Sequence, residues 1–199
     1  AEKRLRVVLP IALFAIWLIL YFQFKRFATT MLVFSGIAFA WSGGFIMLWL
    51  YAQPWFFDLN FFGQNLRELF QMDVINLSVA VWVGFLALFG IATDDGVIMS
   101  TYLEQRFRES PPKNWSQIHE RVIEAASRRV RPALMTSATT ILALLPVLTS
   151  TGRGSDIMLP MAIPSFGGML LAIMTIFVVP VLYCSIEELK LRIRNGTIK

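Results

Sequence analysis

Five long apolar runs dominate this chain, and almost all charged residues lie between these runs or at the chain ends. A bilayer core about 30 Å thick is crossed by roughly 20 apolar residues in helical form. The predicted spans are 7–24, 28–52, 77–103, 133–150 and 161–184. With 56% hydrophobic and only 16% charged residues, the composition excludes a disordered tail and most soluble enzymes. The predicted fold class is an all-α membrane protein, a bundle of five transmembrane helices.

The positions of the basic residues predict the topology. The loops predicted on one side, around 53–76 and 151–160, carry only Arg67 and Arg153. The other side carries thirteen of the 18 Lys and Arg residues: Lys25, Arg26, Arg106, Arg108, Lys113, Arg121, Arg128, Arg129, Arg131, Lys190, Arg192, Arg194 and Lys199. Because cytoplasmic loops are enriched in Lys and Arg, we expect this side and the C-terminus to be cytoplasmic. The net charge of +5 then reflects anchoring in the lipid bilayer, and no nucleic-acid partner is expected.

This topology leaves the N-terminus outside, where Lys3, Arg4 and Arg6 oppose the rule, and the chain does not begin with Met. Both observations favour a fragment that follows an extracytoplasmic domain, with an ordinary trimmed N-terminus as the alternative. The aromatic-rich segment 53–76 is predicted to form a short amphipathic helix at the outer interface. Residues 115–131 are predicted to form a cytoplasmic amphipathic helix, with Pro132 in the first turn of the span that follows.

Asp94 and Asp95 are the only ionisable residues expected deep inside a span. Asp94 lies roughly 14 Å from the cytoplasmic end of its span, where one charge costs at least about 2.5 kcal/mol. Because adjacent carboxylates also disfavour one another's charge, the pair suits groups that take up and release protons. Asp94 shares a helix face with the small residues Ala87 and Gly90, so we expect Asp94 in the bundle interior, with Asp95 beside it or toward a water path. A polar pair without a transport role is the alternative.

The fourth span supplies candidate neighbours for the acidic pair. Its cytoplasmic half carries four hydroxyl residues: Thr136, Ser137, Thr139 and Thr140. Hydroxyls can relay or stabilise a proton, or they can bond back to their own helix, and the sequence leaves both roles open. Arg129 could help to ionise a nearby carboxylate, whereas Arg131 is interpreted as an anchor at the membrane surface.

Small residues recur every four positions in two of the predicted spans. Gly36, Ala40 and Gly44 do so in the second span, and Gly168 and Ala172 in the fifth. Residues four apart share a helix face, so these patterns predict close helix packing rather than a binding site.

The residues that could bind metals give only weak signals. The single cysteine, Cys184, excludes a disulfide framework and a Cys-rich metal site. No spacing of His, Cys, Asp and Glu predicts a zinc or iron site, and no cofactor is expected. His119, on the cytoplasmic helix, is interpreted as solvated. Most of the nine methionines are interpreted as packing residues, and Met158 and Met161 are weak candidates for a shared soft-metal site at the outer surface.

Several segments together resemble the resistance-nodulation-division (RND) efflux pumps, particularly the copper/silver members of their heavy-metal branch. Residues 84–99 (GFLALFGIATDDGVIM) resemble the tenth transmembrane helix, and residues 129–136 (RVRPALMT) resemble the start of the eleventh. Residues 145–158 (LPVLTSTGRGSDIM) resemble the loop that follows it. Residues 163–169 (IPSFGGM) and 179–183 (VPVLY) resemble the twelfth helix. The resemblance covers essentially the whole chain, as helices eight to twelve.

The resemblance implies roles for particular residues. In that family a charged residue on the tenth helix belongs to the proton relay, with acidic partners on the fourth helix, and the matching position here is Asp94. Thr136 and Arg129 match polar relay positions of the eleventh helix. The chain departs from copper/silver members at Asp95, a second acid, and at Ala133, where they carry Lys. The expected proton relay is therefore Asp94, Asp95, Thr136 and Arg129.

The resemblance also implies an assembly and a function. We expect a homotrimeric permease in the bacterial inner membrane that works with a periplasmic adaptor and an outer-membrane channel. The remainder of the same permease would supply the porter domain and the fourth helix. The expected function is proton-driven export of Cu(I)/Ag(I) or divalent metals by a secondary transporter, not an enzyme. Export of drugs or lipids, or a non-transporting lipid or sterol module, is the alternative. An intramembrane aspartyl protease is disfavoured because Asp94 and Asp95 are adjacent on one helix.

Overall fold

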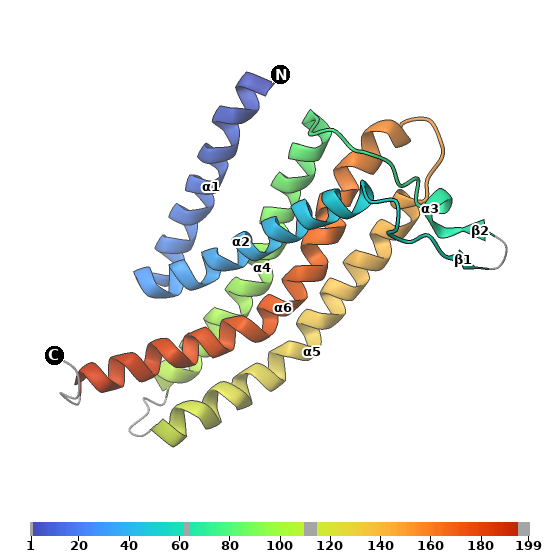
Figure 1. The fold of residues 1–199 in the computed structure, drawn as a ribbon. Coiled ribbons are helices and arrows are strands. Elements are labelled where there is room, and N and C mark those ends of the chain that lie inside the picture. Colours follow the sequence, from blue (N-terminus) through green and yellow to red (C-terminus); the bar gives the residue numbers. More distant parts are fainter. Residues whose placement is uncertain (1, 62–63, 110–114, 195–199) are drawn as a thin grey trace.

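The computed structural model describes residues 2–61, 64–109 and 115–194, and five long helices account for most of them (Figure 1). All five are long and apolar enough to cross a membrane, so the predicted all-α, five-helix fold is confirmed. The helices are α1 (Glu2–Phe24), α2 (Phe27–Tyr51), α4 (Val79–Glu109), α5 (Trp115–Leu148) and α6 (Ser155–Arg194).

One end of the bundle carries most of the described basic residues, and we call it the basic end. It comprises the α1–α2 turn, the last turns of α4, the first turns of α5 and the last turns of α6, at the lower left of Figure 1. Lys113 and Lys199, predicted on this side, lie outside the described residues. At 1.5 Å per residue, the 34 residues of α5 and the 40 of α6 span about 50 and 60 Å. Both helices therefore exceed the hydrocarbon thickness of a bilayer.

The predicted cytoplasmic helix 115–131 and the predicted span 133–150 form one continuous helix, α5, which ends at Leu148. Pro132 was expected in the first turn of a span, but it lies inside this helix. An internal proline costs about 3 kcal/mol because it removes a hydrogen bond and crowds the preceding turn. Val130, Ala133 and Leu134 on either side of it pack against a buried apolar cluster. Tertiary packing there holds the helix together through the proline.

Segment 53–76 was expected to form an interfacial loop or a short amphipathic helix, and its described residues are mostly loop. The structure has a small antiparallel hairpin, β1 (Asn60–Phe61) with β2 (Gln64–Asn65), and a single helical turn, α3 (Leu66–Leu69). Phe57 and Gln71 adopt positive φ angles of 55° and 48°, which a right-handed helix cannot include. The Gln71 side-chain amide donates to the Ser150 carbonyl at 2.6 Å, which ties the segment to the α5–α6 loop.

Small residues let α2 and α6 approach closely. A Cβ atom on Gly43 would lie 2.6 Å from the Gly167 carbonyl oxygen, and one on Gly168 would lie 2.8 Å from the Ala40 carbonyl oxygen. Real Cβ atoms do not tolerate such distances, so these positions require glycine. The close packing predicted around Ala40 and Gly168 is confirmed. Gly43 and Gly167 extend the same contact to positions outside the predicted pattern.

Candidate functional site

Helix α4 carries the acidic pair to the middle of its length. Asp94 is the central residue of the 31 in α4, about 22 Å along the axis from either end. Asp95 is half-buried, and its Oδ2 atom accepts a hydrogen bond of 3.1 Å from the hydroxyl of Ser137 on α5. Ser137 itself is fully buried. This contact is a direct polar link between α4 and α5 at mid-helix.

The expected orientation of the pair is reversed within this chain. Asp94 is exposed, whereas Asp95 is the residue that reaches a neighbouring helix. Successive helical residues point about 100° apart, and α4 packs through the face that contains Leu88, Ala92 and Met99. Asp95 borders that face because it follows Ala92 by three residues and precedes Met99 by four. Asp94 points away from it, along the exposed small-residue face on which the expectation was based.

All four predicted relay residues line one cavity. The cavity has a volume of about 140 Å³ and lies between α4, α5 and α6. Its lining also includes apolar residues from the three helices, so the polar groups sit in an otherwise apolar surround. The lining residues are Asp94, Asp95, Ile98, Met99, Arg129, Pro132, Ala133, Thr136 and Ile176.

Arg129 and Thr136 each have a partner other than the carboxylates. The guanidinium of Arg129 lies over the ring of Tyr102, 4.7 Å from its centroid, which is a favourable cation–π geometry. The Thr136 hydroxyl donates to the Pro132 carbonyl oxygen on its own helix at 3.1 Å. Among the described residues, no ion pair joins Arg129 to Asp94 or Asp95. The cavity thus holds a positive group near two acids without a salt bridge between them.

Two contributors were not among the predicted relay residues. Ser137 was one of four equivalent hydroxyl candidates, and only the structure separates it: Thr139 and Thr140 bond back to their own helix, as Thr136 does. The sequence spacing of Tyr102 gives one indication of its place: it lies two turns after Asp95 and therefore on a similar face of α4. From the sequence alone, neither Ser137 nor Tyr102 could have been selected as part of the site, because the selection depends on where α5 packs against α4.

A second, larger cavity opens on the other side of Asp94. It has a volume of about 590 Å³ and lies between α1, α4 and α5. Asp94 and Thr136 border both cavities. The remaining lining is mostly apolar and comes largely from α1 and α4: Ile16, Ile19, Leu20, Gly90, Ile91, Thr93, Val97 and Thr140. Asp94 therefore lies at the border between the larger cavity and the smaller cavity that contains both acids.

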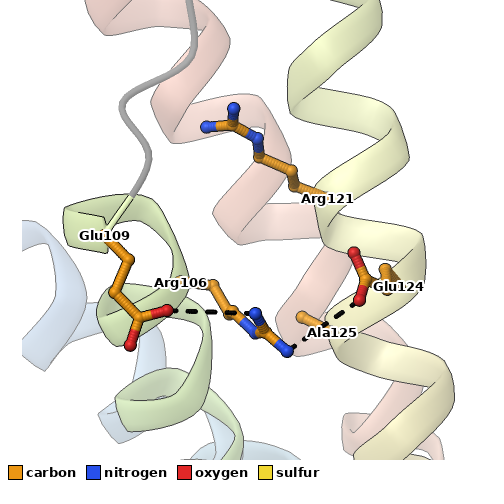
Figure 2. Close-up of a pocket in the computed structure, with 5 residues that line it drawn as sticks. All are labelled: Arg106, Glu109, Arg121, Glu124 and Ala125. Carbon is orange, nitrogen blue, oxygen red and sulfur yellow. Dashed lines mark ion pairs between the residues drawn. The ribbon is translucent and has the colours of Figure 1, made fainter.

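A third cavity lies at the basic end and is lined mainly by charged residues (Figure 2). Arg106, near the end of α4, pairs with Glu109 at 3.8 Å and with Glu124 of α5 at 3.9 Å. Arg121 also lines the cavity, but Figure 2 shows its side chain pointing away from these pairs. Long, exposed ion pairs of this kind contribute little to stability. This cavity is therefore a charged junction between α4 and α5 rather than a second acidic site.

The weak candidates for soft-metal binding lie at the opposite end from the basic residues. Met158 and Met161, in the first two turns of α6, have 53% and 38% of their surface exposed. The Met161 backbone packs against α4, where a Cβ on Gly84 would lie 2.2 Å from the Met161 carbonyl oxygen. A metal site at these methionines stays a prediction.

The chain is similar in sequence and in fold to proteins of known function. Cation efflux system protein CusA of Escherichia coli (strain K12) is 34% identical over 190 residues, which cover 92% of this chain and 16% of CusA. Cobalt-zinc-cadmium resistance protein CzcA of Cupriavidus metallidurans is 31% identical over 184 residues, covering 92% of this chain and 15% of CzcA. A crystal structure of a heavy metal efflux pump matches with a TM-score of 0.72 and 29% identity, covering 94% of this chain and 16% of that chain.

The chain spans only about 16% of the length of these relatives. The model of the AcrB/AcrD/AcrF family matches residues 69–187, which include the acidic pair and the whole lining of the smaller cavity. The predicted resemblance to RND permeases of the heavy-metal branch is confirmed. On this evidence the chain belongs to the AcrB/AcrD/AcrF family and forms part of the transmembrane domain of an RND permease.

Proposed function

We propose that this chain is the C-terminal transmembrane part of a proton-driven RND permease that exports heavy-metal cations. The observation that carries the proposal is the smaller cavity, which gathers Asp94, Asp95, Arg129 and Thr136 near the middle of α4. The names of relatives support the cargo, because one is a cation efflux protein and another a cobalt-zinc-cadmium resistance protein. The proposed cargo is Cu(I) or Ag(I), and a divalent metal is the second choice.

The geometry supports a mechanism in which protonation changes the contact between α4 and α5. An ionised Asp95 accepts a charge-assisted hydrogen bond from Ser137, and such bonds are roughly twice as strong as neutral ones. When Asp95 takes up a proton, this bond weakens and the two helices are freer to shift. Asp94 borders the larger cavity and offers a proton route to the pair. The shift would be passed to the porter domain in the rest of the permease.

The exposed face of α4 supports the proposed partners. Ala87, Gly90, Asp94 and Ile98 lie on one side of the helix, and all four are exposed in this chain. Small residues allow a further helix to pack closely, so a helix from the remainder of the permease is proposed to cover Asp94. The homotrimer, the periplasmic adaptor and the outer-membrane channel are proposed from family membership.

The charge distribution supports a location in the bacterial inner membrane with the basic end in the cytoplasm. Most Lys and Arg residues of the described segments lie at that end. At the opposite end, the hairpin segment and the α5–α6 loop carry Arg67 and Arg153, and the start of α1 carries Lys3, Arg4 and Arg6 (Figure 1). Positive residues are enriched in cytoplasmic loops. The C-terminus is therefore proposed to be cytoplasmic and the hairpin segment periplasmic.

The proposal is tested by removing each charge from the pair in the full-length permease. Asp94→Asn and Asp95→Asn keep the side-chain volume but cannot exchange a proton. Both are expected to abolish metal resistance in a bacterial strain that lacks its own efflux pumps, with permease levels unchanged on immunoblots. In proteoliposomes, both should abolish metal-stimulated proton flux.

The matched control is Asp156→Asn, the same chemical change at an exposed carboxylate in the first turn of α6. This variant is expected to keep resistance and proton flux. Wild-type resistance in both Asp94→Asn and Asp95→Asn at normal protein levels would overturn the proposed relay. Proton flux stimulated by a drug but not by any metal would favour the alternative cargo.

A further inference from the structure

The only histidine and the only cysteine of the chain meet at the basic end, although 65 residues separate them in sequence. His119 belongs to the second turn of α5, and Cys184 and Glu188 lie one turn apart on α6. The His119 Nε2 atom lies 2.5 Å from Glu188 Oε1, and the Cys184 Sγ atom lies 3.7 Å from that same oxygen. One ligand atom from each residue lies within 4.8 Å of the other two.

These three atoms form a donor set that suits a thiophilic divalent cation. Zinc is bound by thiolate sulfur, imidazole nitrogen and carboxylate oxygen at about 2.0 to 2.3 Å, usually in tetrahedral geometry. Tetrahedral ligands at those lengths stand roughly 3.3 to 3.8 Å from one another, and the sulfur–oxygen distance already falls in this range. Small side-chain rotations would open the shorter nitrogen–oxygen contact. The His119 side chain is 59% exposed, so solvent can reach the cluster and fill a fourth position.

The backbone around the cluster is held in place by packing. Ile118, next to His119, is fully buried, and so is Tyr183, next to Cys184. The guanidinium of Arg192 lies over the Trp115 ring, 4.5 Å from its centroid, and thereby joins the same two helices. The three ligand side chains are therefore presented by fixed helical segments, which reduces the entropy lost when a metal binds.

A plain ion pair between His119 and Glu188 explains only part of this arrangement. That pair needs no thiol, and exposed ion pairs contribute little to stability. The Cys184 side chain nevertheless lies against the carboxylate oxygen that His119 contacts. His119 was expected to be solvated rather than a ligand; its side chain is 59% exposed, and its Nε2 atom also contacts Glu188 Oε1.

We propose that His119, Cys184 and Glu188 form a binding site for a thiophilic divalent cation such as Zn²⁺, which bridges α5 and α6. Binding converts the Cys184 thiol to a thiolate, whose proton leaves to solvent, and the neutral His119 ring binds through the Nε2 lone pair with its N–H on Nδ1. The site lies about 12 Å along α6 from Ile176, which lines the smaller cavity that contains both acids. It is separate from the relay, and its test does not depend on transport.

The first test measures the reactivity of Cys184 in the full-length permease in detergent. Zn²⁺ is expected to slow maleimide alkylation of Cys184, followed by mass spectrometry of its peptide, by at least about tenfold, because a metal-bound thiolate is shielded. His119→Gln, a change at an exposed position, should remove this protection. Glu120→Gln, the matched change at the next residue and also exposed, should retain it. Equal alkylation rates with and without Zn²⁺ in the wild type would overturn the site.

The second test uses Co²⁺ as a spectroscopic probe of the same permease. Wild-type protein minus Cys184→Ser protein should show a thiolate-to-cobalt charge-transfer band, and Zn²⁺ should abolish it. Zn²⁺ should also raise the melting temperature of the wild type more than that of His119→Gln, because a ligand stabilises the folded state in proportion to how tightly it binds there. If Cys184→Ser does not fold, the comparison of the Zn²⁺ effect on the melting temperatures of wild type and His119→Gln still tests the site. No band, or equal thermal stabilisation of wild type and His119→Gln, would contradict the proposal.

Discussion

Helix α4 has a packed face, which contacts other helices of this chain, and an open face, which contains Asp94. Both faces carry small residues, but only those on the packed face make close contacts. On the packed face, a Cβ on Gly84 would lie 2.2 Å from the Met161 carbonyl oxygen, and Gly96 packs against Val33 of α2. On the open face, a Cβ on Gly90 would meet nothing within 4 Å. The packed face is covered by other helices of this chain, whereas on the open face Asp94 lines the larger cavity. Within this chain, a small residue in a span makes a close contact only where the chain itself supplies the neighbouring helix.

The largest effect is expected from a substitution that prevents the packed face of α4 from contacting α6. Gly84→Val places two methyl groups where the α6 backbone now lies, and the strain should cost about 3 kcal/mol or more. We expect little folded protein in either the 199-residue chain or the full-length permease. The measurement is the monodisperse fraction in size-exclusion chromatography after detergent extraction. Wild-type yield and elution would show that the close contact between α4 and α6 is not required.

The matched change on the open face should separate folding from function. Gly90→Val has room in this chain, so the 199-residue chain should match the wild type in extraction and elution. In the full-length permease we expect loss of metal resistance, because the added methyl groups obstruct the helix proposed to cover Asp94. Full resistance in this variant would show that no helix packs closely on the open face.

A smaller effect is expected at the border between the two faces, where Asp95 meets α5. Ser137→Ala removes the donor to Asp95, and loss of such a bond costs about 1 kcal/mol, roughly fivefold in a rate that depends on it. The rate of metal-driven proton flux in proteoliposomes is the readout. Thr139→Val serves as the control, since the Thr139 hydroxyl bonds only to carbonyls of its own helix, and it should change the flux less than twofold. Equal effects of both variants would remove Ser137 from the proposed mechanism.

The smallest effect is expected at the basic end of α4, beyond both faces. Arg106→Gln breaks the pairs with Glu109 and Glu124 seen in Figure 2. Exposed ion pairs are screened by water and salt, so the melting temperature should change by no more than about 2 °C. A larger drop would show that the charged junction fixes the position of α4 relative to α5.

Much of the site could be predicted because its signals are local. Asp94 and Asp95 stand out in any apolar run, and the motifs around Arg129 and Thr136 select the same region of the next helix. The structure places all four at one cavity. The orientation of the pair could not be predicted, because it depends on which side of α4 is covered, and α2, α5 and α6 set that side. For the same reason Ser137 could not be separated from the neighbouring threonines.

The sequence by itself determined the number of spans, the charged and apolar ends of each helix, the acidic pair and the family. These follow from composition over short stretches, since water and lipid act on each segment separately. Only the tertiary structure decided that α5 continues through Pro132, that segment 53–76 forms a hairpin and a single helical turn, and that His119 meets Cys184 and Glu188. These depend on contacts between residues far apart in the chain, which local periodicity does not record.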